Sequence, residues 1–321
     1  MVRRRLLKFA IFLCLAFLFL IVFPSACKSF YVYTLSSILL TGLLATSLNF
    51  ALGYGGMYQF HHAVFYGVSA YGIALMLMKV HAPFVFAFLF GPLLSAFLGL
   101  FMGWICLRLA KLYFGMLQLS LGSIVWIIIR RWASLTGGDD GIHGIQIPDF
   151  LSSYTSGYYF TLIVTSISLL ILYKIVRSPF GKVLQSIRDN PLRSEMVGIN
   201  QKRHQLFALV IAAFFGGVAG SLFVVIDRTV FPDIMFFTYS FEILVMCLLG
   251  GLWNFLGPLV GSAVIICLRV LFSAFTVYWT LLVGLLMLLV IFFVPNGILG
   301  YLEDKLRKRA YVQGGEPFKI F

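Results

Sequence analysis

Few side chains in this sequence have the types and spacing that catalysis or metal binding requires. His61 and His62 are adjacent, and the five cysteines are Cys14, Cys27, Cys106, Cys247 and Cys267. An odd number of cysteines without a Cys-x-x-Cys pair predicts neither a disulfide framework nor a zinc site. These histidines and cysteines are not spaced as a nucleophile–base set, and no P-loop, His-Glu-x-x-His, Gly-x-Ser-x-Gly or EF-hand pattern occurs. We therefore expect no bond chemistry and no metal site in this chain.

The carboxylates allow two interpretations each. Glu242 begins a short apolar run, where it could face an ammonium group or stabilise the positive N-terminal end of a helix. We favour the helix end. Asp139 and Asp140 stand in a glycine-rich stretch, but two tandem carboxylates are not a full calcium ligand set. We favour a turn there.

The elements that must position these residues are membrane helices. The chain has 321 residues, of which 61% are hydrophobic and only 11% charged, and its mean hydropathy is +1.01. Soluble domains usually carry about 25% charged residues. Ten apolar runs occur, near 6–23, 33–52, 60–78, 84–107, 112–129, 158–176, 206–226, 239–251, 256–271 and 276–294. Most approach the ~20 residues that cross a bilayer, whereas 239–251 resembles a half-helix that relies on protein neighbours.

The basic residues predict the orientation. The net charge of +13 does not indicate nucleic-acid binding, because the lysines and arginines lie between apolar runs. Most of them fall in the N-terminus, in the loop 177–205 and in the tail 301–321, and these segments are therefore expected in the cytosol. An even number of crossings must separate them, so we favour ten crossings within a range of eight to ten. Residues 130–157 then form an outer loop. Residues 1–27 resemble a secretory signal, but an uncleaved first span is the simpler expectation.

The inner loop 177–205 has a helix–break–helix pattern. Pro179 and Gly181 interrupt the incoming helix, and a short helix with an apolar face follows, ending at Asn190. A second short helix ends at Gly198. Short amphipathic helices at a membrane surface dock on lipid or on a partner, whereas a loop serving only topology would be solvated. The residues alone leave both interpretations open.

Five motifs, in order, resemble one family. They are Gly53–Tyr71, Tyr113–Leu117, Ser134–Gly141, Ser178–Asn190 with Gly198–Asn200, and Leu249–Gly261. Over about residues 30–300 the chain resembles the LivM-type permease subunit of branched-chain amino acid ABC importers. The resemblance implies an all-α polytopic membrane protein of about ten transmembrane helices, similar to the larger-bundle (type II-like) importer permeases. It implies a single permease domain over residues 1–321.

The resemblance also implies partners. These are the lipid bilayer of a bacterial inner membrane, a second homologous permease subunit, two cytosolic ATPase subunits and a periplasmic substrate-binding protein. ATP is then used by a partner, and no cofactor is expected in this chain. The loop 177–205 would couple to the ATPase through Pro179, Phe180, Gly181, Val183, Leu184, Ile187, Arg188, Asp189 and Gly198. The binding protein would dock near Arg130, Arg131, Asp139 and Asp140, although a simple turn is favoured there.

The chain departs from the family pattern after Gly56. The usual Gln, Ser and Gly-His are replaced by Met57, Gln59, His61 and His62. Gln59, His61, His62 and Glu242 are the candidates for the translocation path, because polar side chains within a membrane are costly and often functional. The alternative places Gln59 and His61 in water at the cytosolic end of the span, and we favour it slightly for His61.

The expected function is import of small, branched-chain amino acids. Within the same family, permeases for urea, short amides or other amino acids are alternatives. An ion-coupled secondary transporter would need buried carboxylates, for which only Glu242 is a candidate, and inverted repeats are not evident. An intramembrane enzyme would need a catalytic set that the spacing does not provide.

Overall fold

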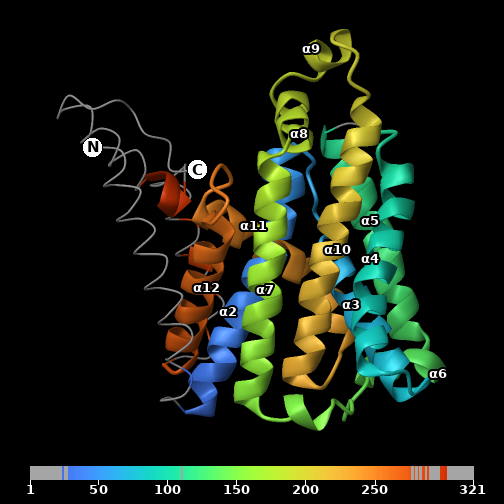
Figure 1. Ribbon diagram of the computed structural model, residues 1–321, viewed down its shortest axis with the longest axis vertical. Coiled ribbons are helices and arrows are strands. Elements are labelled where there is room, and N and C mark those ends of the chain that lie inside the picture. The colour runs from blue at the N-terminus through green and yellow to red at the C-terminus, as the bar shows by residue number, and fades with distance from the viewer. Residues whose placement is uncertain are drawn as a thin grey trace, which may run out of the picture.

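The computed structural model describes residue 24, residues 28–109 and 111–275, and residues 278, 281, 284–285, 288 and 297–301. The predicted span 6–23 lies outside the described residues, as do most of the span 276–294 and of the tail 301–321. In the described part the elements are α2 (Ser29–Asn49), the π-helix η1 (Phe50–Tyr54), α3 (Ala63–Met78), α4 (Phe84–Cys106), α5 (Lys111–Arg131), α6 (Ala133–Thr136), η2 (Gly138–Asp140), η3 (Asp149–Leu151), α7 (Tyr154–Arg177), α8 (Pro179–Asp189), α9 (Pro191–Met196), α10 (Gln201–Asp227), η4 (Pro232–Met235), α11 (Phe237–Gly250) and α12 (Gly257–Ser273) (Figure 1).

The described residues form helices and no strands, so the all-α expectation is confirmed. Five helices are long and apolar enough to cross a membrane, namely α2 with η1, α4, α5, α7 and α10. Three shorter apolar helices, α3, α11 and α12, accompany them. The expected apolar runs match these helices closely, and the chain is a multi-pass membrane protein. The count of ten crossings is not confirmed by the described residues.

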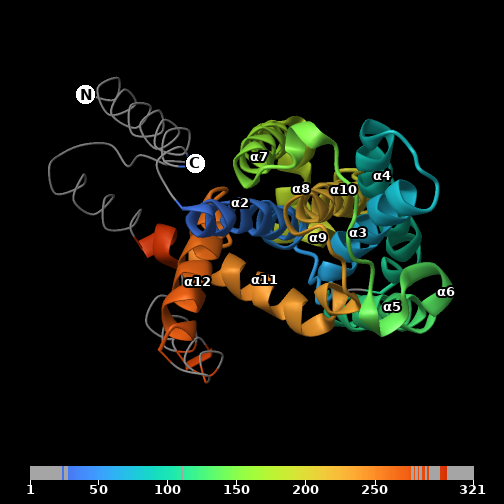
Figure 2. The same ribbon diagram turned by 90° about the horizontal axis from the view of Figure 1, so that it is seen from below.

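Helix α10 lies at the centre of the bundle. It packs against α3 and α4 on one side and against α2 on the other, while α11 and α12 pack on α2 (Figure 2). In contrast, α4 exposes large apolar side chains such as Phe86, Phe97 and Trp104, which suit contact with lipid. The buried core therefore follows α2, α3 and α10, and α4, α5 and α7 form the apolar outside.

Small residues allow the central helices to approach closely. A Cβ atom at Gly220 of α10 would lie 2.0 Å from the carbonyl oxygen of Tyr66 in α3. Beside this contact, the hydroxyl groups of Ser69 and Ser221 are 2.9 Å apart, and Ser95 donates to the carbonyl oxygen of Phe65 at 2.6 Å. Because the lipid is as apolar as the helix surfaces, helices in a membrane associate through close van der Waals packing and hydrogen bonds between them.

Three capped helices begin in the loop 177–205. Ser178 Oγ accepts from Gly181 N at the start of α8, Asn190 Oδ1 accepts from Arg193 N at the start of α9, and Asn200 Oδ1 accepts from Arg203 N at the start of α10. Such caps satisfy N–H groups that have no partner within the helix. The predicted helix–break–helix pattern is therefore confirmed. Helix α9 lies beyond the ends of α4, α5 and α7, at one extremity of the molecule (Figure 1).

Candidate functional site

The first described span, α2 with η1, is followed by a break in the helical chain. The π-helix η1 ends at Tyr54, residues 55–62 are not helical, and α3 begins at Ala63. We call residues 55–62 the helix break. Gly56 has a φ of +66°, which glycine adopts without strain, and Met57 N donates to the carbonyl oxygen of Ala51 at 3.0 Å. Non-helical backbone between membrane helices is tolerated only where protein buries it or where it lines a cavity.

The connection between α10 and α11, which contains the short 3-10 helix η4, meets the helix break. Residues 229–236 connect α10 to α11, and within them Met235 is fully buried. Ser240 of α11 accepts a hydrogen bond from Ala63 N at 2.9 Å, at the start of α3. Helix α11 has 14 residues, which span only ~21 Å of the ~30 Å hydrocarbon core. The short predicted run 239–251 is thus a helix that relies on protein neighbours.

His61 joins these two segments to α5. Its Nε2 atom lies 2.7 Å from the carbonyl oxygen of Met235, and its Nδ1 atom lies 3.2 Å from the carbonyl oxygen of Leu119. Because a neutral imidazole has one N–H, only one of these two carbonyl oxygens accepts from it in that form. The ring occupies a notch in α5, because a Cβ atom at Gly122 would lie 2.2 Å from His61 Nδ1.

His62 is directed toward α2. Its Nε2 atom is 2.9 Å from Ser47 Oγ, and that hydroxyl is 2.7 Å from the carbonyl oxygen of Leu44. Because Ser47 donates to the carbonyl, it accepts from His62, so Nε2 carries the proton of the ring. The Nδ1 atom of His62 is buried without a hydrogen-bond partner in the described structure.

Two buried glutamines lie beside the helix break. Gln59 and Gln118 are 1% and 0% exposed, and neither amide has a hydrogen-bond partner on its nitrogen or its oxygen in the described structure. Gln118 is on the face of α5 that carries Gly115 and Gly122, and the space over those glycines is filled by Phe60 and His61. Both amides therefore lie where α5 packs on the break. An unpaired buried amide costs ~1–3 kcal/mol, so a role other than packing is indicated.

These positions correct one expectation and extend another. Placing Gln59 and His61 in water at the end of a span is wrong, because both side chains are 1% exposed. Gln59, His61 and His62 are all buried, so the second half of the helix break is a buried polar region, in which His61 contacts α5 and His62 contacts α2. Gln118 was missed, because one glutamine in an apolar run gives no sequence signal without its neighbours.

The expectation that Glu242 stabilises the N-terminal end of its helix is wrong, because α11 begins at Phe237 and has no acidic residue in its first turn. It forms an ion pair with Arg269 of α12, and the two side chains are 25% and 36% exposed. A cavity of about 370 Å³ lies next to this pair and is lined by Arg269, Asp227 and Tyr33, among other residues. Tyr33 Oη donates to Asp227 Oδ1 at 2.9 Å. Glu242 is therefore paired with a residue near the end of α12, beside this cavity.

The loops 130–157 and 177–205 differ in how far their expected docking residues are exposed. Arg130 forms an ion pair with Asp139, while Arg131 and Asp140 are exposed. Among the residues expected to contact an ATPase, Leu184 and Ile187 are 0% and 1% exposed, so the apolar face of α8 packs on the rest of the chain. The expectation that this face docks outward is wrong at these two positions.

The exposed apolar surface of the loop is on α9. Leu192, Met196 and Val197 are 71%, 86% and 77% exposed, at the extremity of the molecule. We call these three residues the α9 patch. These three residues were not expected as a docking surface, because six residues are too few to show a periodic pattern. Between α8 and α9 lies a cavity of about 360 Å³, lined by Ser186, Asp189, Asn190, Arg193, Ser194, Val197 and Ile199.

Comparisons with known proteins agree with this architecture. Residues 30–292 match the family model of the permease component of branched-chain amino acid transport systems. The chain is 26% identical over 301 residues to the high-affinity branched-chain amino acid transport system permease protein LivM of Salmonella typhimurium. This match covers 85% of the chain and 71% of the relative. It is also 26% identical over 231 residues to a probable branched-chain amino acid transport permease protein LivM of Methanocaldococcus jannaschii. That match covers 64% of this chain and 66% of the relative.

A more distant relative has a different solute in its name. The guanosine ABC transporter permease protein NupQ of Bacillus subtilis is 24% identical over 112 residues, or 34% of each chain. No solved structure matches significantly. Since the family model covers most of the sequence, the chain belongs to the family of permease components of branched-chain amino acid transport systems.

Proposed function

We propose that this chain is the membrane-spanning subunit of an ABC importer that carries small amino acids, branched-chain ones in particular, across the inner membrane. The observation that carries the proposal is the family match over residues 30–292. The chain binds no ATP itself and catalyses no bond chemistry. Its partners are a second permease subunit, two ATPase subunits and a periplasmic binding protein.

The proposed orientation of the chain in the membrane follows from the distribution of its basic residues. In the described residues, Arg108, Lys111, Arg177, Lys182, Arg188, Arg193, Lys202 and Arg203 lie at the end of the molecule that carries α9. The excess of lysine and arginine favours the cytosol for this end and for both termini. The ATPase then docks on the α9 patch, and the binding protein docks at the opposite end, where Arg131 and Asp140 are exposed.

Leucine uptake by the reconstituted complex tests this function. We expect proteoliposomes that contain both permease subunits and the ATPase to import leucine only with ATP and with the binding protein. Guanosine and urea serve as competing solutes, because one relative of this chain is named a guanosine permease and urea is an alternative solute. Uptake driven by a proton or sodium gradient without the ATPase would contradict the proposal and favour a secondary transporter.

The translocation path is proposed to pass beside the helix break, where Gln59 and Gln118 offer unpaired amides. We expect Gln59→Leu and Gln118→Leu each to lower the leucine uptake rate by about tenfold, if each amide gives ~1.4 kcal/mol to the solute. The same changes remove unpaired buried amides, so the melting temperature should stay equal or rise.

The matched control is Ser120→Leu, an exposed position on α5 two residues from Gln118. It should leave both uptake and melting temperature near those of the unmodified complex. A variant of Gln118 that melts higher and transports normally would show that this amide only fills space.

A further inference from the structure

Arg188 lies in the last turn of α8 and contacts two other parts of the chain as well as its neighbour Asp189. Its Nη1 atom donates to the carbonyl oxygen of Gly53 in η1 at 2.6 Å. Its guanidinium lies 4.5 Å from the ring centroid of Trp253, in the turn between α11 and α12. Its Nε and Nη2 atoms donate to Asp189 Oδ1 at 2.9 and 2.7 Å. The side chain is 20% exposed.

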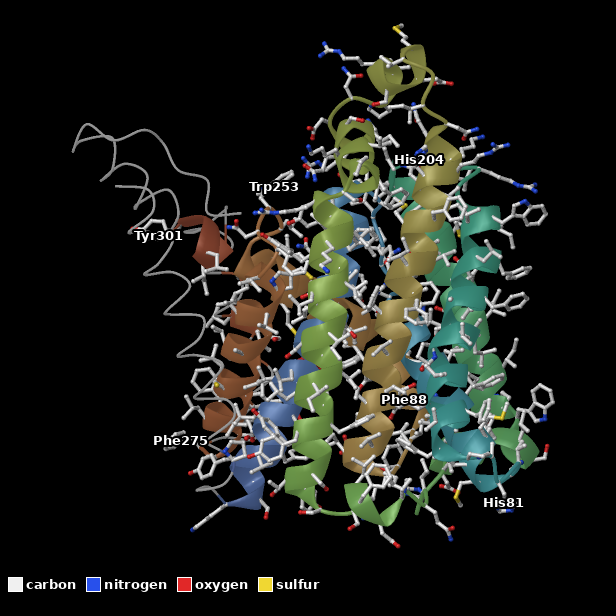
Figure 3. All side chains as sticks on the ribbon, viewed as in Figure 1. His81, Phe88, His204, Trp253, Phe275 and Tyr301 are labelled. Atoms are coloured by element: carbon white, nitrogen blue, oxygen red, sulfur yellow. The ribbon has the colours of Figure 1, made fainter. Side chains whose placement is uncertain are left out.

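The carbonyl group that Arg188 binds lies at the end of a helix. Gly53 belongs to the last turn of η1, whose carbonyl oxygens lose their intrahelical donors where the helix stops. A charge-assisted hydrogen bond to such an oxygen is about twice as strong as a neutral one. Asp189 fixes the plane of the guanidinium, and Trp253 supports its face (Figure 3 labels Trp253 at this end of the molecule).

The backbone of the helix break also touches α8 directly. A Cβ atom at Gly56 would lie 2.8 Å from Arg188 Cγ and 3.3 Å from Arg188 Cα. With a φ of +66°, Gly56 both turns the chain and leaves room for Arg188. Three residues later comes Gln59, followed by His61 and His62, so the contact lies at the start of the buried polar region.

Arg188 therefore connects a surface element to an interior one. On one side, α8 continues through Asn190 into α9, whose start Asn190 caps. On the other side, Leu184 and Ile187 bury α8 against the membrane bundle. Because α8 leads directly into α9, a displacement of α9 is expected to move α8. Arg188 donates to Gly53 in η1 and lies against Gly56 of the helix break, so it connects α8 to the segment that leads into the break.

We infer that Arg188 is a positioning residue that transmits movement of α8 and α9 to the helix break. This inference rests on the proposed function, in which an ATPase moves α9. Arg188 was expected to contact the ATPase, but its guanidinium is directed into the chain, toward η1 and Trp253. In transport, Arg188 connects the translocation path beside the helix break to the α9 patch on which the ATPase docks.

The test measures the number of ATP molecules hydrolysed per leucine imported by the reconstituted complex. We expect Arg188→Gln to raise this ratio by about tenfold, the change that loss of ~1.4 kcal/mol of coupling produces. The ATPase should remain bound and basal hydrolysis should be unchanged. Arg188→Lys should raise the ratio less, because lysine keeps the charge but lacks the planar fork. Lys182→Gln, an exposed position on the same helix, is the matched control and should leave the ratio unchanged.

A second variant examines the same contact from its other side. Gly56→Ala places a Cβ atom against Arg188 while leaving the guanidinium intact, and it should raise the ratio as well. If Arg188→Gln lowers uptake and ATP hydrolysis in proportion, or releases the ATPase, the residue is only structural and the inference is overturned. Failure of the proposed function is a different result, because the unmodified complex would then import no leucine with ATP.

Discussion

Leu192→Asp combined with Met196→Asp is expected to release the ATPase from the purified complex. The two side chains are 71% and 86% exposed on α9, and docking would remove their apolar surface from water. Burying a large aliphatic side chain contributes ~1.5–3 kcal/mol, so losing two should weaken association by at least about 100-fold. The measurement is the amount of ATPase subunit that co-purifies with the tagged permease at equal permease yield.

The control for this prediction is Lys182→Asp. It introduces the same carboxylate at an exposed position of α8, outside the α9 patch. It should retain the ATPase. Asn190 caps α9 and Asn200 caps the following helix α10, so the exposed substitutions should leave α9 folded. If the double variant still binds the ATPase as tightly as the unmodified chain, the docking surface lies elsewhere.

The second large effect is expected at the contact between α10 and α3. Gly220→Ala would place a Cβ atom 2.0 Å from the carbonyl oxygen and 2.9 Å from the carbonyl carbon of Tyr66. Neither atom belongs to a flexible side chain, so the two helices must separate. Overpacking of this kind costs ~1–3 kcal/mol, and separation also lengthens the nearby hydrogen bond between Ser69 and Ser221. We expect a lower melting temperature in detergent and reduced uptake.

Gly157→Ala in α7 is the matched substitution. The added Cβ atom would lie 3.4 Å from Ile226 Cδ1, an ordinary contact with the end of a side chain. Because alanine also favours the helix over glycine by ~1 kcal/mol, this variant should be as stable as the unmodified chain or more stable. Equal melting temperatures for the two alanine variants would contradict the close approach of α10 and α3.

The sequence alone predicted the helices of the described region and their ends within a few residues. The runs 84–107 and 112–129 correspond to α4 and α5, and Pro179, Asn190 and Gly198 marked the boundaries of the two short helices. These features are local. Hydrophobic length, proline and glycine act within a few residues of the chain, so the order of the residues is enough to determine them.

The tertiary structure decided which residues face each other. An apolar run suits lipid and protein neighbours equally well, so the sequence could not show that α10 is central or that α4 lies outside. For the same reason the burial of Leu184 and Ile187, and the exposure of the α9 patch, were not predictable.

The polar region shows this division most clearly. Gln59, His61 and His62 were singled out from their types, but the sequence did not show which of them has a partner or where that partner lies. His61 bonds to the carbonyl oxygen of Met235, and Arg188 bonds to that of Gly53. Gln118 became a candidate only through its place on α5. The sequence determined that polar groups enter the membrane, and packing of distant segments determined which of them are paired, which are left unpaired, and which are linked to the surface at α9.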